Sequence, residues 1–193
     1  MRVSHGAGRV AAWAIGLAII GFCCSARAES PDATVWTALK DGGIVLFRHA
    51  NAPGVGDPPG MKLGDCKTQR NLDETGRAQA RQIGRSFQAK GVSAGRVIAS
   101  QWCRAMETAE LAFPGRVEAE PEFNSFFDDR SKSSAQTERA RKILLAWRGP
   151  DALVVVTHQV NIQALIGQAL SSGEGVVVKA VDTRLVIVGR IKP

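Results

Sequence analysis

The chain has 193 residues, 45% of them hydrophobic, with four cysteines and a formal net charge of +7 at pH 7. This length is sufficient for one domain with a buried core. The mildly basic balance favours anionic ligands, but no run of lysines and arginines supports a nucleic-acid-binding surface, so nucleic acid is not an expected partner.

Residues 1–28 have the pattern of a secretory signal peptide. A basic start precedes an almost wholly apolar run over residues 10–24, and Ala-Arg-Ala at residues 26–28 forms an A-x-A cleavage site. The apolar run is shorter than the roughly 20 residues that span a bilayer. We therefore expect residues 29–193 to form a single periplasmic or secreted domain with no membrane span. An uncleaved anchor and a lipoprotein acylated at a leader cysteine are the alternatives.

Removal of the leader changes both the charge and the cysteine count. The leader carries three arginines and no acidic residue, so the net charge falls from +7 to +4, and only Cys66 and Cys103 remain. An exported protein with two cysteines is expected to join them in a disulfide, the alternative being two buried thiols. The remaining cysteines and histidines show no metal-site spacing, so we expect no metal and no cofactor.

The first half of the mature chain predicts two helices and one strand. A short helix begins at Ser30-Pro31 and stops at Gly42-Gly43, and a strand follows over residues 44–48. Residues 51–65 form a loop rich in proline and glycine, and a loop of this length in a compact domain is generally functional. Asp73 caps a helix that runs to about Lys90, with small residues that allow close packing on a sheet.

The second half alternates predicted strands and helices, which implies a three-layer α/β/α sandwich with a mostly parallel central sheet. The expected strands are residues 97–100, a short one near Val117, 153–157, 176–181 and 185–191, and the expected helices are 104–112, 133–148 and 160–170. Asp182-Thr183 is expected to turn the last two strands.

The two histidines of the mature domain each stand where an apolar run ends. His49 follows the strand at residues 44–48, and His158 follows the strand at 153–157. Such β-branched runs are typical of strands buried on both faces of a parallel sheet, and ligands bind at the carboxyl ends of such strands. We therefore expect both imidazoles to face one pocket, together with the neighbouring Arg48.

The arginines near these strand ends indicate an anionic ligand. Arg104 and Asn161 lie close to predicted helix N-termini, whose free N–H groups and dipole attract anions. Guanidinium groups form forked hydrogen bonds that match phosphate oxygens. Two guanidiniums and two imidazoles at one sheet edge suit a phosphoryl dianion, whereas surface arginines and structural histidines are the alternative interpretation.

Three motifs together resemble the histidine phosphatase superfamily, which has the phosphoglycerate-mutase-like fold. They are Arg48-His49-Ala50, the Ser-x-x-x-Arg-Ala-x-x-Thr-Ala stretch at residues 100–109, and the late His158. Residues 71–76, Asn-Leu-Asp-Glu-Thr-Gly, are similar to the family's Leu-Thr-x-x-Gly helix start. The resemblance covers about residues 36–191, and any one of its motifs alone is not specific.

The resemblance implies a phosphohistidine mechanism without a metal or cofactor. His49 would attack phosphorus, and Arg48, Arg104 and His158 would hold the equatorial oxygens before water hydrolyses the phosphohistidine. The acid-phosphatase and phytase branch usually has Asp after the second histidine. Gln159 stands there instead, which favours the mutase-like branch 1. The expected partner is a phosphorylated small molecule or a phosphoprotein.

The proton donor departs from the family pattern. Branch 1 often supplies a Glu in a Leu-x-Glu segment after the arginine helix, and Ser125 occupies that place here. Asp128 is the first candidate donor, followed by Glu122 and Asp129, with solvated loop carboxylates as the alternative. Without an acid, the preferred substrate has a good leaving group, as in phosphohistidine, an acyl phosphate or pyrophosphate.

Further residues at the same sheet edge are candidates for substrate contact and for the disulfide. Arg70, Asn51 and Gln159 are candidate substrate-binding residues, with a solvated side chain as the alternative for Arg70. Cys66 ends the long loop and Cys103 directly precedes Arg104, so a bridge would fasten the loop beside the pocket.

The sequence thus predicts an exported phosphatase that acts on a phosphomonoester or a related phosphoryl compound. The main alternative is a catalytically idle phosphate-ligand binding module on the same fold, which the missing Glu supports. A phosphoglycerate mutase is disfavoured by the leader and by the absent Glu.

Overall fold

A single six-stranded sheet forms the centre of the protein, in a computed structural model that describes residues 1–3 and 31–192. The predicted signal peptide falls almost wholly outside these described residues. The strands are β1 (Ile44–Arg48), β2 (Ala94–Ala99), β3 (Val117–Ala119), β4 (Ala152–Thr157), β5 (Gly175–Val181) and β6 (Arg184–Ile191). Their order is β3-β2-β4-β1-β5-β6. The first four strands are parallel, β5 is antiparallel to β1, and β6 is antiparallel to β5. The predicted mostly parallel sheet is confirmed.

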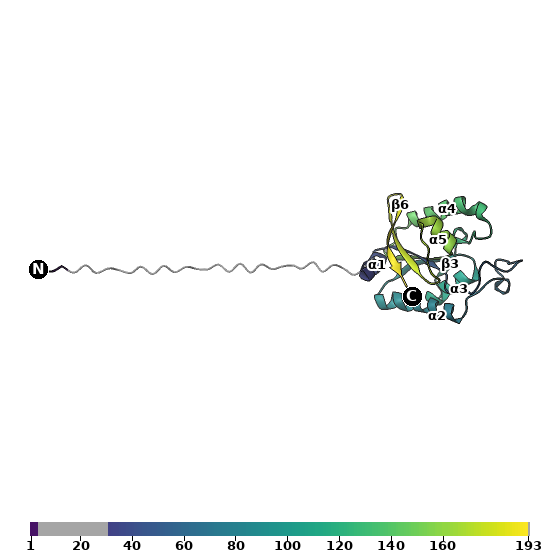
Figure 1. Ribbon diagram of the computed structural model, residues 1–193, viewed down its shortest axis with the longest axis horizontal. Coiled ribbons are helices and arrows are strands. Elements are labelled where there is room, and N and C mark those ends of the chain that lie inside the picture. Colours follow the sequence, from purple (N-terminus) through teal and green to yellow (C-terminus); the bar gives the residue numbers. More distant parts are fainter. Residues whose placement is uncertain (4–30, 193) are drawn as a thin grey trace.

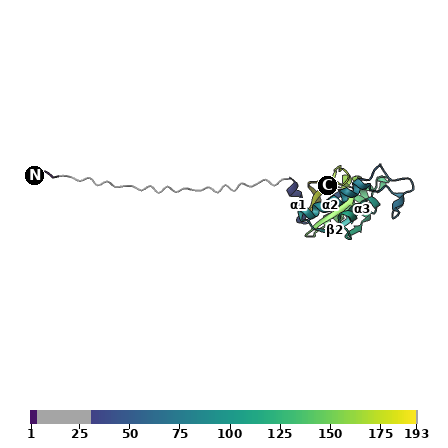
Figure 2. The same cartoon turned by 90° about the horizontal axis from the view of Figure 1, so that it is seen from below.

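Helices cover both faces of the sheet, as the predicted three-layer sandwich requires (Figure 1). The α-helices are α1 (Pro31–Lys40), α2 (Glu74–Lys90), α3 (Cys103–Ala112), α4 (Ser133–Ala146) and α5 (Gln159–Ile166), and the 3₁₀ helices are η1 (Cys66–Thr68), η2 (Pro121–Phe123) and η3 (Arg130–Lys132). Side chains from α1, α2 and α3 pack on one face, and side chains from α4 and α5 pack on the other. Figure 2 shows α1, α2 and α3 from their own side of the sheet.

The continuous apolar run of β4 follows from this double coverage. Val154 and Val156 point to the face beneath α1, α2 and α3, while Leu153 and Val155 point to the face beneath α4 and α5. Successive side chains of a strand alternate between faces, so a strand covered on both sides has no solvent-facing position. Among residues 1–3 and 31–192, no helix combines the length and apolar character needed to cross a membrane.

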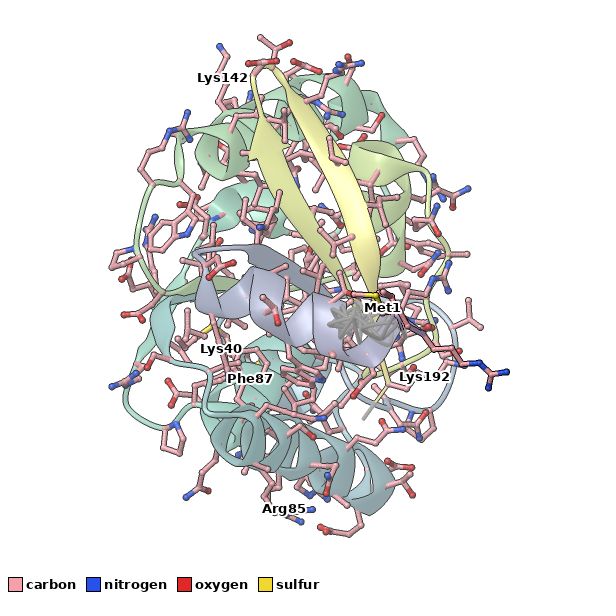
Figure 3. The ribbon with its side chains drawn as sticks, turned by 90° about the vertical axis from the view of Figure 1, so that its left-hand side faces the viewer. Met1, Lys40, Arg85, Phe87, Lys142 and Lys192 are labelled. Atoms are coloured by element: carbon pink, nitrogen blue, oxygen red, sulfur yellow. A yellow bond between two sulfur atoms is a disulfide. The ribbon has the colours of Figure 1, made fainter. Side chains whose placement is uncertain are left out.

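Helix α2 shows how the sequence signals become structure. The Asp73 side chain accepts a hydrogen bond from the Gly76 N–H at 2.7 Å, and Gly91 ends the helix in the left-handed region at φ 62°. Phe87 is 2% exposed and packs edge-on against the ring of Trp36. Figure 3 shows Phe87 pointing inward from α2 toward α1, with Arg85 on the outer side.

Two helices end earlier than the sequence predicts. α5 was expected to reach residue 170 but ends at Ile166, because Gly167 adopts the left-handed conformation at φ 70°. α4 was expected to reach residue 148 but ends at Ala146. Trp147 is extended there, and its indole N–H donates to the Gly42 carbonyl at 3.1 Å.

Parallel pairing of β1 with β4 brings the two sequence-distant histidines together. Arg48 pairs with Thr157 in the register, so the residues that follow leave the sheet side by side at its carboxyl end. The His49 N–H donates to the Thr157 carbonyl at 2.9 Å, which extends the ladder by one residue. The ends of β1 and β4 therefore lie next to each other, as expected.

Helix α2 lies unusually close to the chain that leaves β1. A Cβ atom placed on Gly76 would lie 2.1 Å from the carbonyl oxygen of Asn51, a contact that only movement of backbone could relieve. Gly76 therefore permits the close packing that holds the residues after His49.

We expect Gly76→Ala to destabilise the protein by about 1–3 kcal/mol, because the steric cost exceeds the roughly 1 kcal/mol gained in helix propensity. Urea denaturation measures the effect. The matched control is Gln88→Ala, at an exposed position of the same helix, which should change stability by less than about 0.5 kcal/mol. Equal stability of Gly76→Ala and wild type would contradict the close approach.

Candidate active site

A cavity of about 200 Å³ opens at the carboxyl ends of β1 and β4. Most side chains predicted to take part in catalysis or substrate binding line it, and the exceptions are Asn51 and the alternative proton donors Glu122 and Asp129. The lining residues are Arg48, His49, Gly54, Val55, Gly56, Asp57, Arg70, Arg104, Ser125, Phe127, Asp128, His158, Gln159 and Val160.

His49 is held as a neutral imidazole whose Nε2 is unprotonated. Its Nδ1 lies 2.8 Å from the Ala50 carbonyl oxygen, which can only accept, so Nδ1 carries the proton and Nε2 does not. The residue is 3% exposed, and burial together with the positive charge of Arg104 lowers the pKa of His49 to about 3. At neutral pH its Nε2 is therefore an available nucleophile.

His158 lies beside His49 and is also held neutral. The two ring centroids are 5.4 Å apart, with the planes 64° from parallel. Burial and the neighbouring cationic groups lower the pKa of His158 well below its usual value. Its Nε2 lies 2.7 Å from the Ser100 hydroxyl, and when Ser100 donates to Nε2 the ring proton resides on Nδ1. Ser100, the first residue of the 100–109 motif, thus orients this imidazole.

Arg104 connects α3 to the nucleophile. Its side chain is 3% exposed, and its Nε donates to His49 Nε2 at 3.3 Å. One turn later, the Thr108 hydroxyl accepts a hydrogen bond from the Ala50 N–H at 3.0 Å and donates to the Arg104 carbonyl at 2.6 Å. The Arg and Thr of the 100–109 motif therefore hold the segment that carries His49.

Arg48 lines the cavity and carries a buried donor without a partner among the described residues. Its Nη1 donates to the Leu170 carbonyl at 2.9 Å, whereas its buried Nε has no hydrogen-bond partner in the part of the chain that the structure describes. A buried guanidinium N–H without an acceptor is costly, and an oxyanion would satisfy it.

Gln159 lines the cavity, but its side chain amide is engaged elsewhere. Its Oε1 accepts from the Leu170 N–H at 2.9 Å, and the Leu170 carbonyl in turn accepts from Arg48. Gln159 therefore fixes the turn that orients Arg48. The early end of α5 is what allows residues 168–170 to return to this position.

The side chains of Asn51 and Arg70 form hydrogen bonds within the segment that follows β1. The Asn51 amide donates to the Asp73 carboxylate at 2.8 Å and does not line the cavity, so its placement does not support the expected substrate contact. Arg70 does line the cavity, and its guanidinium donates to the carbonyls of Gly56, at 2.7 Å, and Ala52. Arg70 therefore holds the loop at the edge of the site.

The three candidate proton donors lie in different surroundings. Asp128 lines the cavity and is exposed. Glu122 pairs with Arg139 at 2.8 Å, and Asp129 caps η3 and pairs with Lys132 at 2.9 Å. Of these three carboxyl groups, Asp128 alone lines the cavity.

Asp57 is a site residue that the sequence analysis did not single out. Its side chain is 3% exposed and accepts from Arg104 Nη1 at 2.8 Å, the Arg70 N–H at 3.0 Å and Trp102 Nε1 at 2.9 Å. Burial raises the pKa of Asp57, but these hydrogen bonds outweigh it and hold the pKa below its usual value. Only the length of the loop pointed to this region, because no motif marks the aspartate.

The predicted disulfide is present between Cys66 and Cys103, with Cα atoms 5.7 Å apart. It joins η1 to the first residue of α3, directly before Arg104. The Gln69 side chain reinforces the link by accepting from the Cys103 N–H at 2.9 Å. The end of the loop over residues 51–65 is therefore fastened beside the cavity.

Comparison with known proteins agrees with the resemblance. Residues 44–126 match the model of the family described as the histidine phosphatase superfamily (branch 1). A search of curated proteins gave no match. The structure is similar to that of the protein histidine phosphatase SixA complexed with tungstate, at 16% identity and a TM-score of 0.60, over 78% of this chain and 97% of that chain.

Two further solved structures have the same fold. The alpha-ribazole phosphatase from Shigella flexneri is 15% identical, with a TM-score of 0.56 over 75% of this chain and 94% of that chain. Phosphoserine phosphatase from Entamoeba histolytica, in complex with 3-phosphoglyceric acid, is 11% identical, with a TM-score of 0.58 over 79% and 98%. The predicted phosphoglycerate-mutase-like fold is confirmed.

The neutral state of both imidazoles predicts an unusual titration. NMR of the ring resonances should show His49 unprotonated down to about pH 3 and His158 unprotonated near pH 6.5, where the unfolded chain in urea titrates. The unfolded state binds more protons at pH values below about 6.5, so folded-state stability should fall as the pH drops through that range. A folded-state midpoint near 6.5 for His49 would contradict the assignment.

The disulfide predicts a stability difference. Replacing both cysteines with serine should lower the free energy of unfolding by about 3–4 kcal/mol, because the bridge restrains a loop of 37 residues in the unfolded chain. Wild type reduced by dithiothreitol is the chemical control and should behave like the double variant. Two free thiols in the unfolded, unreduced mature protein would show that the bridge does not form.

Proposed function

We propose that the protein is an exported phosphatase with a phosphohistidine intermediate, and the match of residues 44–126 to the histidine phosphatase superfamily (branch 1) supports this proposal. Its substrate is a phosphomonoester or a related phosphoryl compound. The observation that carries the proposal is the unprotonated Nε2 of His49, which lies 3.3 Å from Nε of Arg104.

In the first step, the lone pair of His49 Nε2 forms a bond to phosphorus while the bond to the leaving-group oxygen breaks, and the electron pair goes to that oxygen. Arg48, Arg104 and the His158 N–H hold the three other phosphoryl oxygens and stabilise the charge that develops on them. In the second step, water attacks phosphorus while the Nε2–P bond breaks and its electron pair returns to Nε2. The proton that the water loses passes to the carboxylate of Asp128, which restores both side chains. The side chains themselves supply the positive charge.

Asp128 is the proposed proton donor to the leaving group. It lines the cavity, whereas Glu122 and Asp129 are committed to Arg139 and Lys132. Because Asp128 is exposed to solvent rather than held against the phosphate site, we propose that the preferred substrates carry a good leaving group. The solved relatives are named for action on a phosphoprotein histidine, alpha-ribazole phosphate and phosphoserine, which supports either a phosphorylated small molecule or a phosphoprotein.

A catalytically idle phosphate-binding module is the second candidate. It is favoured by Ser125, which lines the cavity at the place where the family pattern has Glu. Turnover of p-nitrophenyl phosphate separates the two functions, because this substrate needs little help from an acid.

The proposal of export combines the leader pattern with the disulfide. Residues 1–28 have a basic start, an apolar run and a cleavage site. A disulfide persists in oxidising compartments such as the periplasm and is rare in the cytosol. The Cys66–Cys103 bridge beside the cavity therefore supports a periplasmic or secreted enzyme.

We expect His49→Ala to abolish turnover of p-nitrophenyl phosphate while sparing the fold, because it removes the nucleophile and little core packing. Acid quench of the wild type with ³²P-labelled substrate should trap an acid-labile phosphoenzyme that His49→Ala lacks. Gln88→Ala, remote from the cavity, is the control and should behave as wild type. Wild-type turnover in His49→Ala would rule out the covalent mechanism.

If the protein is exported, its mature chain should have a defined N-terminus. N-terminal sequencing of protein from the periplasmic fraction should begin at or near Glu29, because cleavage follows the Ala-Arg-Ala site. An acylated cysteine in the leader would instead indicate a lipoprotein, and an intact Met1 in the membrane fraction would indicate an anchor.

A further inference from the structure

Asp57 links the long loop after β1 to the groups that contact both histidines. Its Oδ1 accepts from Arg104 Nη1 at 2.8 Å, and its Oδ2 accepts from Trp102 Nε1 at 2.9 Å. Arg104 in turn donates to His49 Nε2 at 3.3 Å, and the Trp102 ring meets the His158 ring edge-on at 5.4 Å between centroids. One buried carboxylate therefore orients a neighbour of each imidazole.

Asp57 also sets the charge of the cavity. The side chains of Arg48, Arg70 and Arg104 line the cavity, and both imidazoles are neutral. Three guanidiniums against the Asp57 carboxylate leave a net charge of +2, equal and opposite to that of a phosphoryl dianion. Asp128, the other carboxylate on the lining, is exposed, so solvent screens it.

The position of Asp57 has opposite consequences for catalysis and for anion binding. Holding Arg104 at a fixed angle favours the transition state, because phosphoryl transfer depends on aligned donors. A carboxylate bound to the same guanidinium repels any phosphate dianion that enters, including the product. A residue that served only to stabilise the fold would not separate these two effects.

We propose that Asp57 is a positioning residue that aligns Arg104 and Trp102 for catalysis while weakening the binding of the phosphate product. The alignment half rests on the proposed phosphatase function. The charge half concerns anion binding alone and does not require turnover.

The test compares Asp57→Asn and Asp57→Glu with wild type, using calorimetric binding of inorganic phosphate and turnover of p-nitrophenyl phosphate. Asp57→Asn should bind phosphate about tenfold more tightly, because a nearby negative charge is lost, and its kcat should fall about 100-fold. Asp57→Glu keeps the negative charge but lengthens the side chain by one methylene, which displaces the carboxylate from Arg104. Phosphate affinity should therefore stay within about twofold of wild type while kcat falls.

The matched control is Asp41→Asn, which makes the same charge change at an exposed position before β1, at the opposite end of the sheet. It should alter neither measurement. Phosphate binding by Asp57→Asn that weakens or stays unchanged would overturn the charge role, and wild-type kcat in Asp57→Glu would overturn the alignment role. If Asp57→Asn does not fold, kcat of Asp57→Glu still decides the alignment role, and a phosphate affinity of Asp57→Glu that differs from wild type by more than about twofold would overturn the charge role.

The outcomes also separate this inference from the proposed function. A wild-type protein that binds phosphate but turns over no substrate would defeat the phosphatase proposal. The tenfold tighter binding by Asp57→Asn would still support the charge role in that case, and its absence would overturn it.

Discussion

Parallel pairing of β1 with β4 is the interaction on which the rest of the site depends. The register that opposes Arg48 to Thr157 makes His49 and His158 neighbours, although 109 positions separate them in the sequence. Burial of both strands on both faces maintains that register, because a slip of one residue would turn every buried side chain to the wrong face. The long loop, α3 and the turn after α5 then meet at the same sheet edge.

Electrostatics at this edge reflect a balance between burial and charge. Burial and the guanidiniums both disfavour protonated imidazoles, so the positive charge of the cavity resides on arginines, which keep their protons. His49 can then act as a nucleophile without first losing a proton. The carboxylate of Asp57 offsets part of the guanidinium charge, and the disulfide fastens the end of the loop that carries it.

Most of the fold could be predicted from the sequence, since apolar periodicity and capping residues are local signals. The strand at residues 44–48 and the helix capped by Asp73 match the prediction. The end of α4 could not be predicted, because Trp147 leaves the helix to donate its indole N–H to the distant Gly42 carbonyl. The end of α5 is a local C-cap at Gly167, a signal that the predicted helix over residues 160–170 ran past. The motif residues converge as expected, but the partners of Asn51 and Asp57 depend on loop packing. Asp57 pairs with an arginine 47 positions away, a relation that no local pattern encodes.

We expect the cavity at the ends of β1 and β4 to bind an oxyanion against the unprotonated Nε2 of His49. A crystal structure of the protein soaked with tungstate would show whether this contact forms. Tungstate should lie within bonding distance of His49 Nε2, with its oxygens hydrogen-bonded to Arg48, Arg104 and His158. Tungstate bound elsewhere, or a His49 ring whose Nε2 points away from it, would show that this cavity is not the phosphoryl site.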